Sequence, residues 1–466
     1  MTRPDRRAAA GPHRALLEDA AQRAIRYLES LGTRPVAPAA EAVSRLAALA
    51  GPLPATPVDD ASVLARLDEL VGPATMAMAG PRFFGFVIGG ALPATVAANW
   101  LATAWDQNAA LSTATPGVSH VEALALAWLK ELFGLPVSTQ GAFVTGATMA
   151  NFTALAAARH RVLEQAGWPV EAEGLFGAPP ITVIVGEEVH PTLVKSLGLL
   201  GLGRKRVLRV PVDGQGRMRP DRLPKIAGPT ILCLQAGNLN TGAFDPLAEL
   251  CGVAHASGAW CHVDGAFGLW ARASAGLAPL AAGIELADSW ATDAHKWLNV
   301  PYDCGIALVR DPGSLPAAMS IAAEYLPAGD GARNPADYTP ELSRRARGVE
   351  VWAALASLGR SGVAEMLDRN CRGARRFAAG LAAGGHEVLN EVVLNQVLVS
   401  FGEPAVTERV IEAVQADGTC WCGRTAWQGR TAMRISVCSW ATGDDDVEAS
   451  LAAILSVAQR VKAGAR

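Results

Sequence analysis

Residues 290–297, Trp-Ala-Thr-Asp-Ala-His-Lys-Trp, place a lysine between apolar and aromatic neighbours. Lysines are scarce in this chain, which has six among its 41 basic residues. Desolvation disfavours the ammonium form of a lysine, so an amine held among apolar groups can attack carbonyl carbons. Lys296 is therefore a candidate for Schiff-base chemistry. The alternative is a lysine at the end of a strand or helix whose charge extends to water.

An aspartate stands 32 residues before that lysine, in the stretch His262-Val-Asp264-Gly-Ala266. An apolar run from Gly258 to Val263 leads into it. Such a run predicts a buried strand, and an acid at the carboxyl end of a buried strand can face the ligand crevice of an α/β fold. An aspartate at a pyridine nitrogen and a lysine at an aldehyde are the two contacts that pyridoxal phosphate (PLP) requires of a protein.

These two stretches resemble the signature of the PLP-dependent group II amino acid decarboxylases, which act on aromatic amino acids, glutamate, histidine or diaminobutyrate. The resemblance extends from about Gly80 to the C-terminus, through several motifs in the family's order. It implies PLP as the cofactor, with Lys296 as its covalent anchor and Asp264 at its pyridine nitrogen. It also implies that Ala266 and His295 belong to the cofactor site.

The stretch Phe143-Val-Thr-Gly-Ala-Thr-Met-Ala-Asn151 is typical of a strand end, a glycine turn and a helix start. The free N–H groups and positive dipole end of a helix N-terminus hold a phosphate well. The stretch resembles the family's phosphate motif, which implies that Ala147 and Thr148 bind the cofactor. The family usually has glycine where Ala147 stands, and a Thr-Gly turn also precedes many ordinary helices.

Two further cofactor contacts follow from the resemblance. His190, after Glu188-Val, matches the histidine that stacks on the pyridine ring and positions the substrate, although a lone histidine is often structural. Asn238 stands in the family's Ala-Gly-Thr-Thr turn where a threonine contacts the cofactor. An amide can supply similar hydrogen bonds, so Asn238 is predicted to do the same.

Substrate recognition is predicted from the segment 81–90, which crowds three aromatic residues beside glycines. Packing in a core is one interpretation of this segment. The other, from the resemblance, is that Phe84, Phe86 and Ile88 line the substrate pocket. Arg434, on an apolar strand, is a possible partner for a carboxylate, as in fold type I aminotransferases.

Residues 320–343 are rich in Gly, Pro, Asp and Ala, which predicts a long loop. Long loops without secondary structure are often active-site lids. The resemblance implies a mobile lid here, with Tyr338 as the acid that returns a proton to the substrate's Cα. An ordinary surface tyrosine is the alternative.

Apolar strands alternate with helices in the middle of the chain, which predicts a mostly parallel sheet covered on both faces. With the resemblance, this indicates a fold type I, aspartate-aminotransferase-like α/β protein. We expect an N-terminal helical segment over residues 1–80, a large PLP-binding domain over 81–348 and a small α+β domain over 349–466. The expected strands of the large domain are 181–185, 207–210, 230–234, 260–263, 289–292 and 305–309.

Bulk properties exclude several classes of protein. Half of the residues are hydrophobic and 18% are charged, so most of the chain is expected to fold. A net charge of -3 gives no reason to expect nucleic acid or an anionic membrane as a partner. The eight cysteines have no metal or disulfide spacing, so no metal is predicted and we expect reduced thiols in a cytoplasmic protein. The helices expected at 15–31 and 58–71 have apolar stripes, and the resemblance implies that they pack on a partner subunit in a homodimer.

The sequence thus predicts a PLP-dependent carboxy-lyase that converts an L-amino acid, with an aromatic or apolar side chain, into an amine and CO2. Acidic or diamino acid decarboxylation remains open. A PLP-dependent carbon–carbon lyase or a decarboxylating aldehyde synthase on the same scaffold is a second possibility, and an interaction protein without cofactor is a third.

Overall fold

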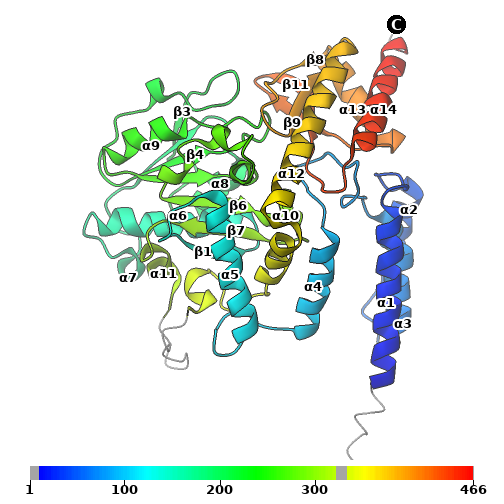
Figure 1. Ribbon diagram of the computed structural model, residues 1–466, viewed down its shortest axis with the longest axis horizontal. Coiled ribbons are helices and arrows are strands. Elements are labelled where there is room, and N and C mark those ends of the chain that lie inside the picture. Colours follow the sequence, from blue (N-terminus) through cyan, green and yellow to red (C-terminus); the bar gives the residue numbers. More distant parts are fainter. Residues whose placement is uncertain (1–9, 322–332, 465–466) are drawn as a thin grey trace, which may run out of the picture.

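The structure is a computed structural model that describes residues 10–321 and 333–464 (Figure 1). A seven-stranded sheet forms its centre, in the order β1-β7-β6-β5-β4-β2-β3. Strand β7 runs antiparallel to both of its neighbours, and the remaining pairs are parallel. The strands are β1 (Gln140–Val144), β2 (Thr182–Gly186), β3 (Leu208–Val210), β4 (Thr230–Gln235), β5 (Trp260–Asp264), β6 (Ser289–Asp293) and β7 (Gly305–Val309).

Helices cover both faces of this sheet because successive residues of its strands point to opposite sides. In β2, Val183 and Val185 pack with α6 and α8, whereas Ile184 packs in the core that includes α5 and α9. The helices of this part are α4 (Pro93–Trp105), α5 (Pro116–Phe133), α6 (Ala147–Glu164), α7 (Val170–Glu173), α8 (Pro191–Leu199), α9 (Leu247–His255), α10 (Ala294–Trp297) and α11 (Ser314–Met319).

A smaller antiparallel sheet, in the order β10-β11-β9-β8, forms a second core with the C-terminal helices. The long helix α12 links the two parts, and Gly359 interrupts its helical backbone. The elements of this C-terminal part are α12 (Gly348–Ala383), β8 (Glu387–Val388), β9 (Gln396–Ser400), α13 (Pro404–Asp417), β10 (Gly423–Trp427), β11 (Arg430–Ser436) and α14 (Asp444–Ala463). The fold predicted from the sequence is confirmed, although α4, α9 and β10 were not anticipated.

The N-terminal helices α1 (Ala10–Ser30) and α3 (Asp60–Leu70) lie side by side, apart from the large sheet (Figure 1). An ion pair of 2.8 Å joins Arg23 to Asp68 across them, and the short helix α2 (Ala40–Ser44) lies between them in sequence. Apolar side chains on both helices remain exposed, among them Leu17, Ile25 and Leu67.

All eight cysteines are free and buried. Across residues 10–321 and 333–464, none of the helices has the length and apolar character needed to cross a membrane.

Candidate active site

The carboxyl ends of β1, β2, β4, β5 and β6 meet at one edge of the large sheet, and the loops that follow them surround a cavity of about 330 Å3. Parallel strands bring these ends together, so residues far apart in sequence share one site. The cavity is lined by Thr145, Gly146, Ala147, Thr148, His190, Thr192, Gln235, Gly237, Leu239, Asp264, Ala266, Phe267, Asp293, His295, Lys296 and Tyr302.

Lys296 lies on α10, the single turn that begins directly after β6. Its Nζ is 3.2 Å from the Oδ2 atom of Asp293, a carboxylate that is 3% exposed. Sequence reasoning expected apolar neighbours around this lysine and missed the anionic partner, although Asp293 belongs to the same stretch. An amine between an apolar wall and a buried carboxylate is held in place and faces the cavity.

The backbone of Lys296 is fixed by the segment 81–90. A Cβ on Gly89 would lie 1.8 Å from the Lys296 carbonyl oxygen, so only glycine allows this approach. The side chain of Asn299 adds hydrogen bonds to the carbonyls of Trp297 and Cys438, each at 3.1 Å. Two other parts of the chain therefore hold the turn that carries the lysine.

Asp264 ends β5 at the opposite wall, and a buried network orients its carboxylate. Asn151 donates to Asp264 Oδ2 at 3.2 Å, and the N–H of Ala266 donates to Oδ1 at 3.2 Å. The Oδ1 atom of Asn151 is in turn 2.7 Å from His262 Nε2, which fixes the orientation of the amide. Burial raises the pKa of Asp264, whereas His190, Lys296 and these two donors oppose the rise.

His262 is neutral in this network. Burial lowers the pKa of His262 to about 3, and its Nδ1 lies 2.9 Å from the hydroxyl oxygen of Ser289. Its role in orienting Asn151 was missed from the sequence, where only the motif that contains it was noted.

The turn between β1 and α6 forms the third wall. Gly146 is the N-cap of α6, and no side chain among the described residues caps this helix. A Cβ at Gly146 would lie 3.1 Å from the His295 ring, so the turn is tightly packed. The first-turn N–H groups next to Ala147 and Thr148 thus border the cavity, as the sequence predicted for a phosphate site.

These three walls fit PLP. An amine, a buried carboxylate and a helix N-terminus border one cavity, and they match the aldehyde, the ring nitrogen and the phosphate of the cofactor. The geometry thus brings together Lys296, Asp264, Ala266, Ala147 and Thr148, as expected from the sequence.

His190 lies over the same cavity and caps α8. Its Nδ1 accepts a hydrogen bond from the N–H of Thr192 at 3.3 Å and lies 2.6 Å from the hydroxyl of that residue. Burial lowers the pKa of His190, and the positive charges of Lys296 and Arg434 add to this, whereas the carboxylates of Asp264 and Asp293 oppose it. A neutral imidazole with its Nδ1 occupied has its Nε2–H available to a ligand.

His295, which the sequence analysis assigned to the cofactor site, and Tyr302, which it did not single out, complete the rim. Tyr302 stacks on His295 with ring centroids 4.3 Å apart, and both line the cavity. Burial lowers the pKa of His295, and its Nδ1 accepts a hydrogen bond from Cys304 N at 3.1 Å. The backbone of Cys304 thus holds the His295 ring, and the aromatic pair lines the cavity together with Phe267 and Leu239.

Arg434 lies on β11 beside the cavity. It is 7% exposed, and its guanidinium donates to the carbonyl oxygen of Leu239 at 3.3 Å. Burial lowers the pKa of Arg434 to about 10. Arg434 forms no ion pair among the described residues. A buried cation of this kind, next to a site, can bind an anionic group.

None of the three residues of the predicted substrate pocket lines this cavity. Phe84 is fully buried in the second core, where its ring contacts Phe377 edge-on at 5.1 Å, and it does not line the cavity. Phe86 is 58% exposed against Trp421, and Ile88 is also absent from the cavity wall. Core packing, the other interpretation of this segment, holds for Phe84. Its backbone hydrogen bonds join it to Trp421 and Ser436 at the small sheet, before the chain reaches Lys296.

Asn238 is also placed differently from the expectation. Its Oδ1 accepts from the N–H groups of Asn240 and Thr241 at 2.8 and 3.2 Å, and its amide donates to Gln235. The side chain thus stabilises its own turn, and the neighbours Gly237 and Leu239 border the cavity instead.

Part of the expected lid, residues 322–332, lies outside the described residues. Tyr338 follows it in a short turn and packs with the core of α6 and α8, under the guanidinium of Arg333 at 4.0 Å from the ring centroid. It does not line the cavity. The role of Tyr338 as an acid stays a prediction.

Comparison with known proteins identifies relatives over most of the chain. The profile of the family described as the pyridoxal-dependent decarboxylase conserved domain matches residues 49–402. The aromatic-L-amino-acid decarboxylase of Bacillus atrophaeus is 30% identical over 347 residues, which are 71% of this chain and 70% of the relative. The L-2,4-diaminobutyrate decarboxylase of Acinetobacter baumannii is 27% identical over 396 residues, 78% of this chain and 76% of the relative.

A crystal structure of Oryza sativa TDC with PLP and tryptamine shares the fold. Its TM-score is 0.89 at 22% sequence identity, with 99% of each chain covered. Other relatives are acidic amino acid, tryptophan and aspartate decarboxylases, so the relatives differ widely in substrate.

Proposed function

Since the chain belongs to the family of pyridoxal-dependent decarboxylases, and is thus a PLP-dependent amino acid decarboxylase, we propose that its substrate is an L-amino acid with an aromatic or apolar side chain. The products are CO2 and the corresponding amine. The observation that carries this proposal is the stacked pair of Tyr302 and His295, which gives the cavity an aromatic wall next to Lys296. Aromatic side chains contact such walls favourably in offset or edge-on arrangements.

We assign one role to each wall of the cavity. The amine of Lys296 anchors the cofactor, and the N-terminus of α6 holds its phosphate through backbone N–H groups. The carboxylate of Asp264 keeps a proton on the ring nitrogen, since Asn151 and Ala266 donate to its charged form. When bound, PLP supplies an electron sink for the bond that breaks at the substrate's Cα.

The remaining residues act on the substrate. The neutral ring of His190 orients the substrate from above, with its Nε2–H free to donate. The aromatic wall keeps water from one side of the reacting carboxylate, and desolvation of a carboxylate favours loss of CO2. Tyr338, supplied by the lid segment of this or a partner subunit, would then deliver the proton to Cα.

Arg434 supports a second candidate, an acidic amino acid substrate. A buried guanidinium beside His190 and Leu239 would be a partner for a side-chain carboxylate. The same group would serve an aromatic substrate by holding its α-carboxylate before the reaction. Arg434→Gln therefore removes the partner of the side-chain carboxylate in one candidate and the partner of the α-carboxylate in the other.

A panel of L-amino acids distinguishes the two substrate classes. CO2 release should be measured for phenylalanine, tyrosine, tryptophan, glutamate, aspartate and 2,4-diaminobutyrate. We expect the highest kcat/KM for an aromatic substrate. The proposal is wrong if an acidic or diamino substrate is the best one, and Arg434→Gln should then remove activity towards the acidic substrates alone.

The amine product distinguishes decarboxylation from aldehyde synthesis. Tyr338→Phe removes the proposed proton donor, and we expect aldehyde, ammonia and peroxide in air in place of amine. Tyr325→Phe is the matched variant, since Tyr325 is the other tyrosine of the segment and lies outside the described residues. An unchanged amine yield for Tyr338→Phe would exclude Tyr338 as the acid.

We also infer a homodimer. The exposed apolar residues of α1, α3 and α4, among them Leu17, Leu67, Trp100 and Leu101, would be covered by a second copy. Sedimentation should show twice the monomer mass, and Leu101→Glu should shift it towards the monomer. A monomer in the wild type would contradict this inference.

A further inference from the structure

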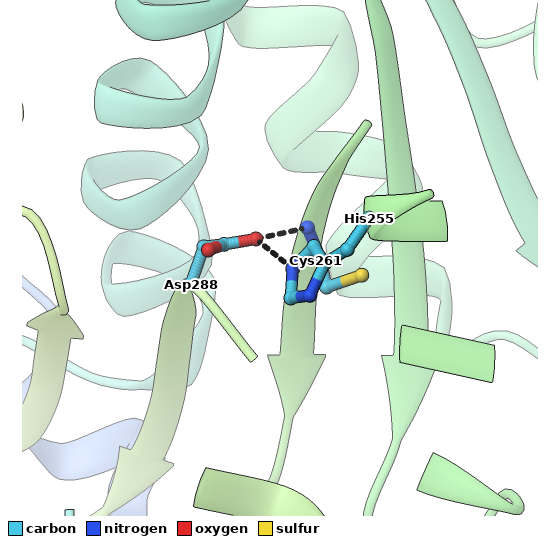
Figure 2. A group of neighbouring side chains, drawn as sticks. All are labelled: His255, Cys261 and Asp288. Carbon is cyan, nitrogen blue, oxygen red and sulfur yellow. Dashed lines mark hydrogen bonds and ion pairs between the residues drawn. The ribbon is translucent and has the colours of Figure 1, made fainter. Parts of the chain in front are cut away.

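Three metal-ligand side chains meet at the edge of the large sheet opposite the cofactor cavity (Figure 2). His255 is the last residue of α9, Cys261 is the second residue of β5, and Asp288 directly precedes β6. The donor atoms of the three side chains all lie within 4.8 Å of one another. At about 3.3 Å per residue along β5, Cys261 is separated from Asp264 by roughly 10 Å. The cluster is thus distinct from the catalytic residues.

The three side chains come from different elements, and the backbone holds two of them in place. Asp288 Oδ2 accepts from the N–H of Cys261 at 2.8 Å, and Asp288 N donates to the Cys261 carbonyl at 2.8 Å. His255 Nε2 lies 2.9 Å from the same Asp288 oxygen. The strands therefore set the positions of the carboxylate and the thiol, while the imidazole at the end of the helix completes the group.

The three side chains offer one imidazole nitrogen, one carboxylate oxygen and one thiol sulfur. Cys261 is fully buried and free. This donor set of nitrogen, oxygen and sulfur suits zinc with three protein ligands and one further position for water.

The cluster is also accessible to a cation. His255 and Asp288 line a surface cavity of about 450 Å3, and the side chain of His255 is 36% exposed. Zinc bonds of about 2.0–2.3 Å require the donors to lie about 3.4–3.7 Å apart in a tetrahedron. The present separations therefore need adjustments of about an ångström, which a partly exposed histidine at a helix end can make.

We propose that His255, Cys261 and Asp288 bind one zinc-like divalent cation outside the active site. The cation would join the end of α9 to the starts of β5 and β6. Binding releases the proton of the Cys261 thiol, because zinc is coordinated by thiolate.

A simple histidine–carboxylate hydrogen bond is the competing explanation, and the chain contains a matched control for it. His160 Nδ1 lies 2.7 Å from Glu171 Oε2 without a cysteine beside the pair. His160→Gln and His255→Gln thus remove the same kind of hydrogen bond, and only the second removes a proposed zinc ligand. Because His255 is partly exposed, its variant should fold even if Cys261→Ser does not.

The test is a titration of the purified holoenzyme with Zn2+ after chelation and removal of bound metal. We expect one zinc per chain for the wild type and for His160→Gln, and at least tenfold weaker binding for His255→Gln. X-ray absorption at the zinc edge should show one sulfur atom at about 2.3 Å. Zinc should raise the Tm of the wild type and leave that of His255→Gln unchanged.

Three results would overturn the proposal. These are the absence of stoichiometric zinc, equal affinity of the wild type and His255→Gln, and a zinc environment of nitrogen and oxygen alone. The last result would assign any bound zinc to surface histidines and carboxylates or to the cofactor.

Discussion

Strands β5 and β6 carry a group of polar side chains at each end, and the two ends differ in what surrounds them. At the carboxyl end, Asp264 and Asp293 are buried beside Lys296, and loops from three further strands close the cavity. At the amino end, Cys261 is buried, but Asp288 and His255 reach the surface.

The difference follows from the architecture of a parallel sheet. The carboxyl ends of all strands except β7 lie at one edge, so the loops there form the walls of the cavity, and helix N-termini point their N–H groups towards the same space. The amino end receives the ends of helices, and only one side chain of α9 contributes to the cluster. Activity should therefore be sensitive to each substitution at the carboxyl end of the strands, whereas substitutions at the amino end should have small effects.

The largest effect is expected at the lysine. Lys296→Ala removes the amine that faces the cavity, so CO2 release should fall by several orders of magnitude. Borohydride treatment should no longer leave a pyridoxyl group on the peptide that contains residue 296. Lys195→Ala, an exposed lysine of α8, is the control and should retain wild-type activity. A labelled peptide in Lys296→Ala would assign the anchor to another residue.

A smaller loss is expected at the opposite wall. Asp264→Asn keeps the size of the side chain but removes its charge, so the ring nitrogen of the cofactor loses its anionic partner. We expect kcat to fall about 10²–10³-fold, the range for losing one preorganised electrostatic contact. Cofactor content should be measured alongside the rate. A rate within about threefold of wild type at full occupancy would remove this role from Asp264.

The buried histidine behind Asp264 should make stability depend on pH. The pKa of His262 is about 3 in the folded protein, against 6.5 for an unperturbed histidine. Below pH 6.5 the unfolded chain therefore binds a proton that the folded protein does not, and stability falls as the pH falls. The contribution is about 1.4 kcal/mol per pH unit, down to the folded pKa.

Denaturant unfolding of the wild type and His262→Gln between pH 7 and pH 4 isolates this effect, because other groups contribute equally to both proteins. We expect the variant to lose less stability as the pH falls. Parallel curves would show that His262 is protonated in the folded protein.

The smallest effect is expected at the amino end of the strands. Asp288→Asn retains an oxygen that can accept from Cys261 N, and it loses only a partly exposed pairing with His255. Without added zinc, the free energy of unfolding should fall by less than about 1 kcal/mol, with activity unchanged. A loss of activity comparable to that of Asp264→Asn would contradict the contrast between the two ends.

The parts of the site that could be predicted are those whose chemistry lies within a short stretch. Lys296, Asp264 and the turn at Ala147 each follow a strand, and strand ends at one edge of a sheet must converge. Asp293 and Tyr302 were missed because nothing in a linear pattern says which way their side chains point. Phe84 was misplaced for the same reason, since an apolar segment can serve a pocket or a core.

By itself, the sequence determined the α/β fold, the order of its strands along the chain and the residues that match a PLP site, because periodicity and strand-end residues are local properties. Only the tertiary structure decided the direction of each side chain and the neighbours that it meets. It paired Lys296 with Asp293, connected Asp264 through Asn151 to His262, and placed His255 beside Cys261 and Asp288. Burial and charge act between residues that are close in space, and chain folding alone brings them there.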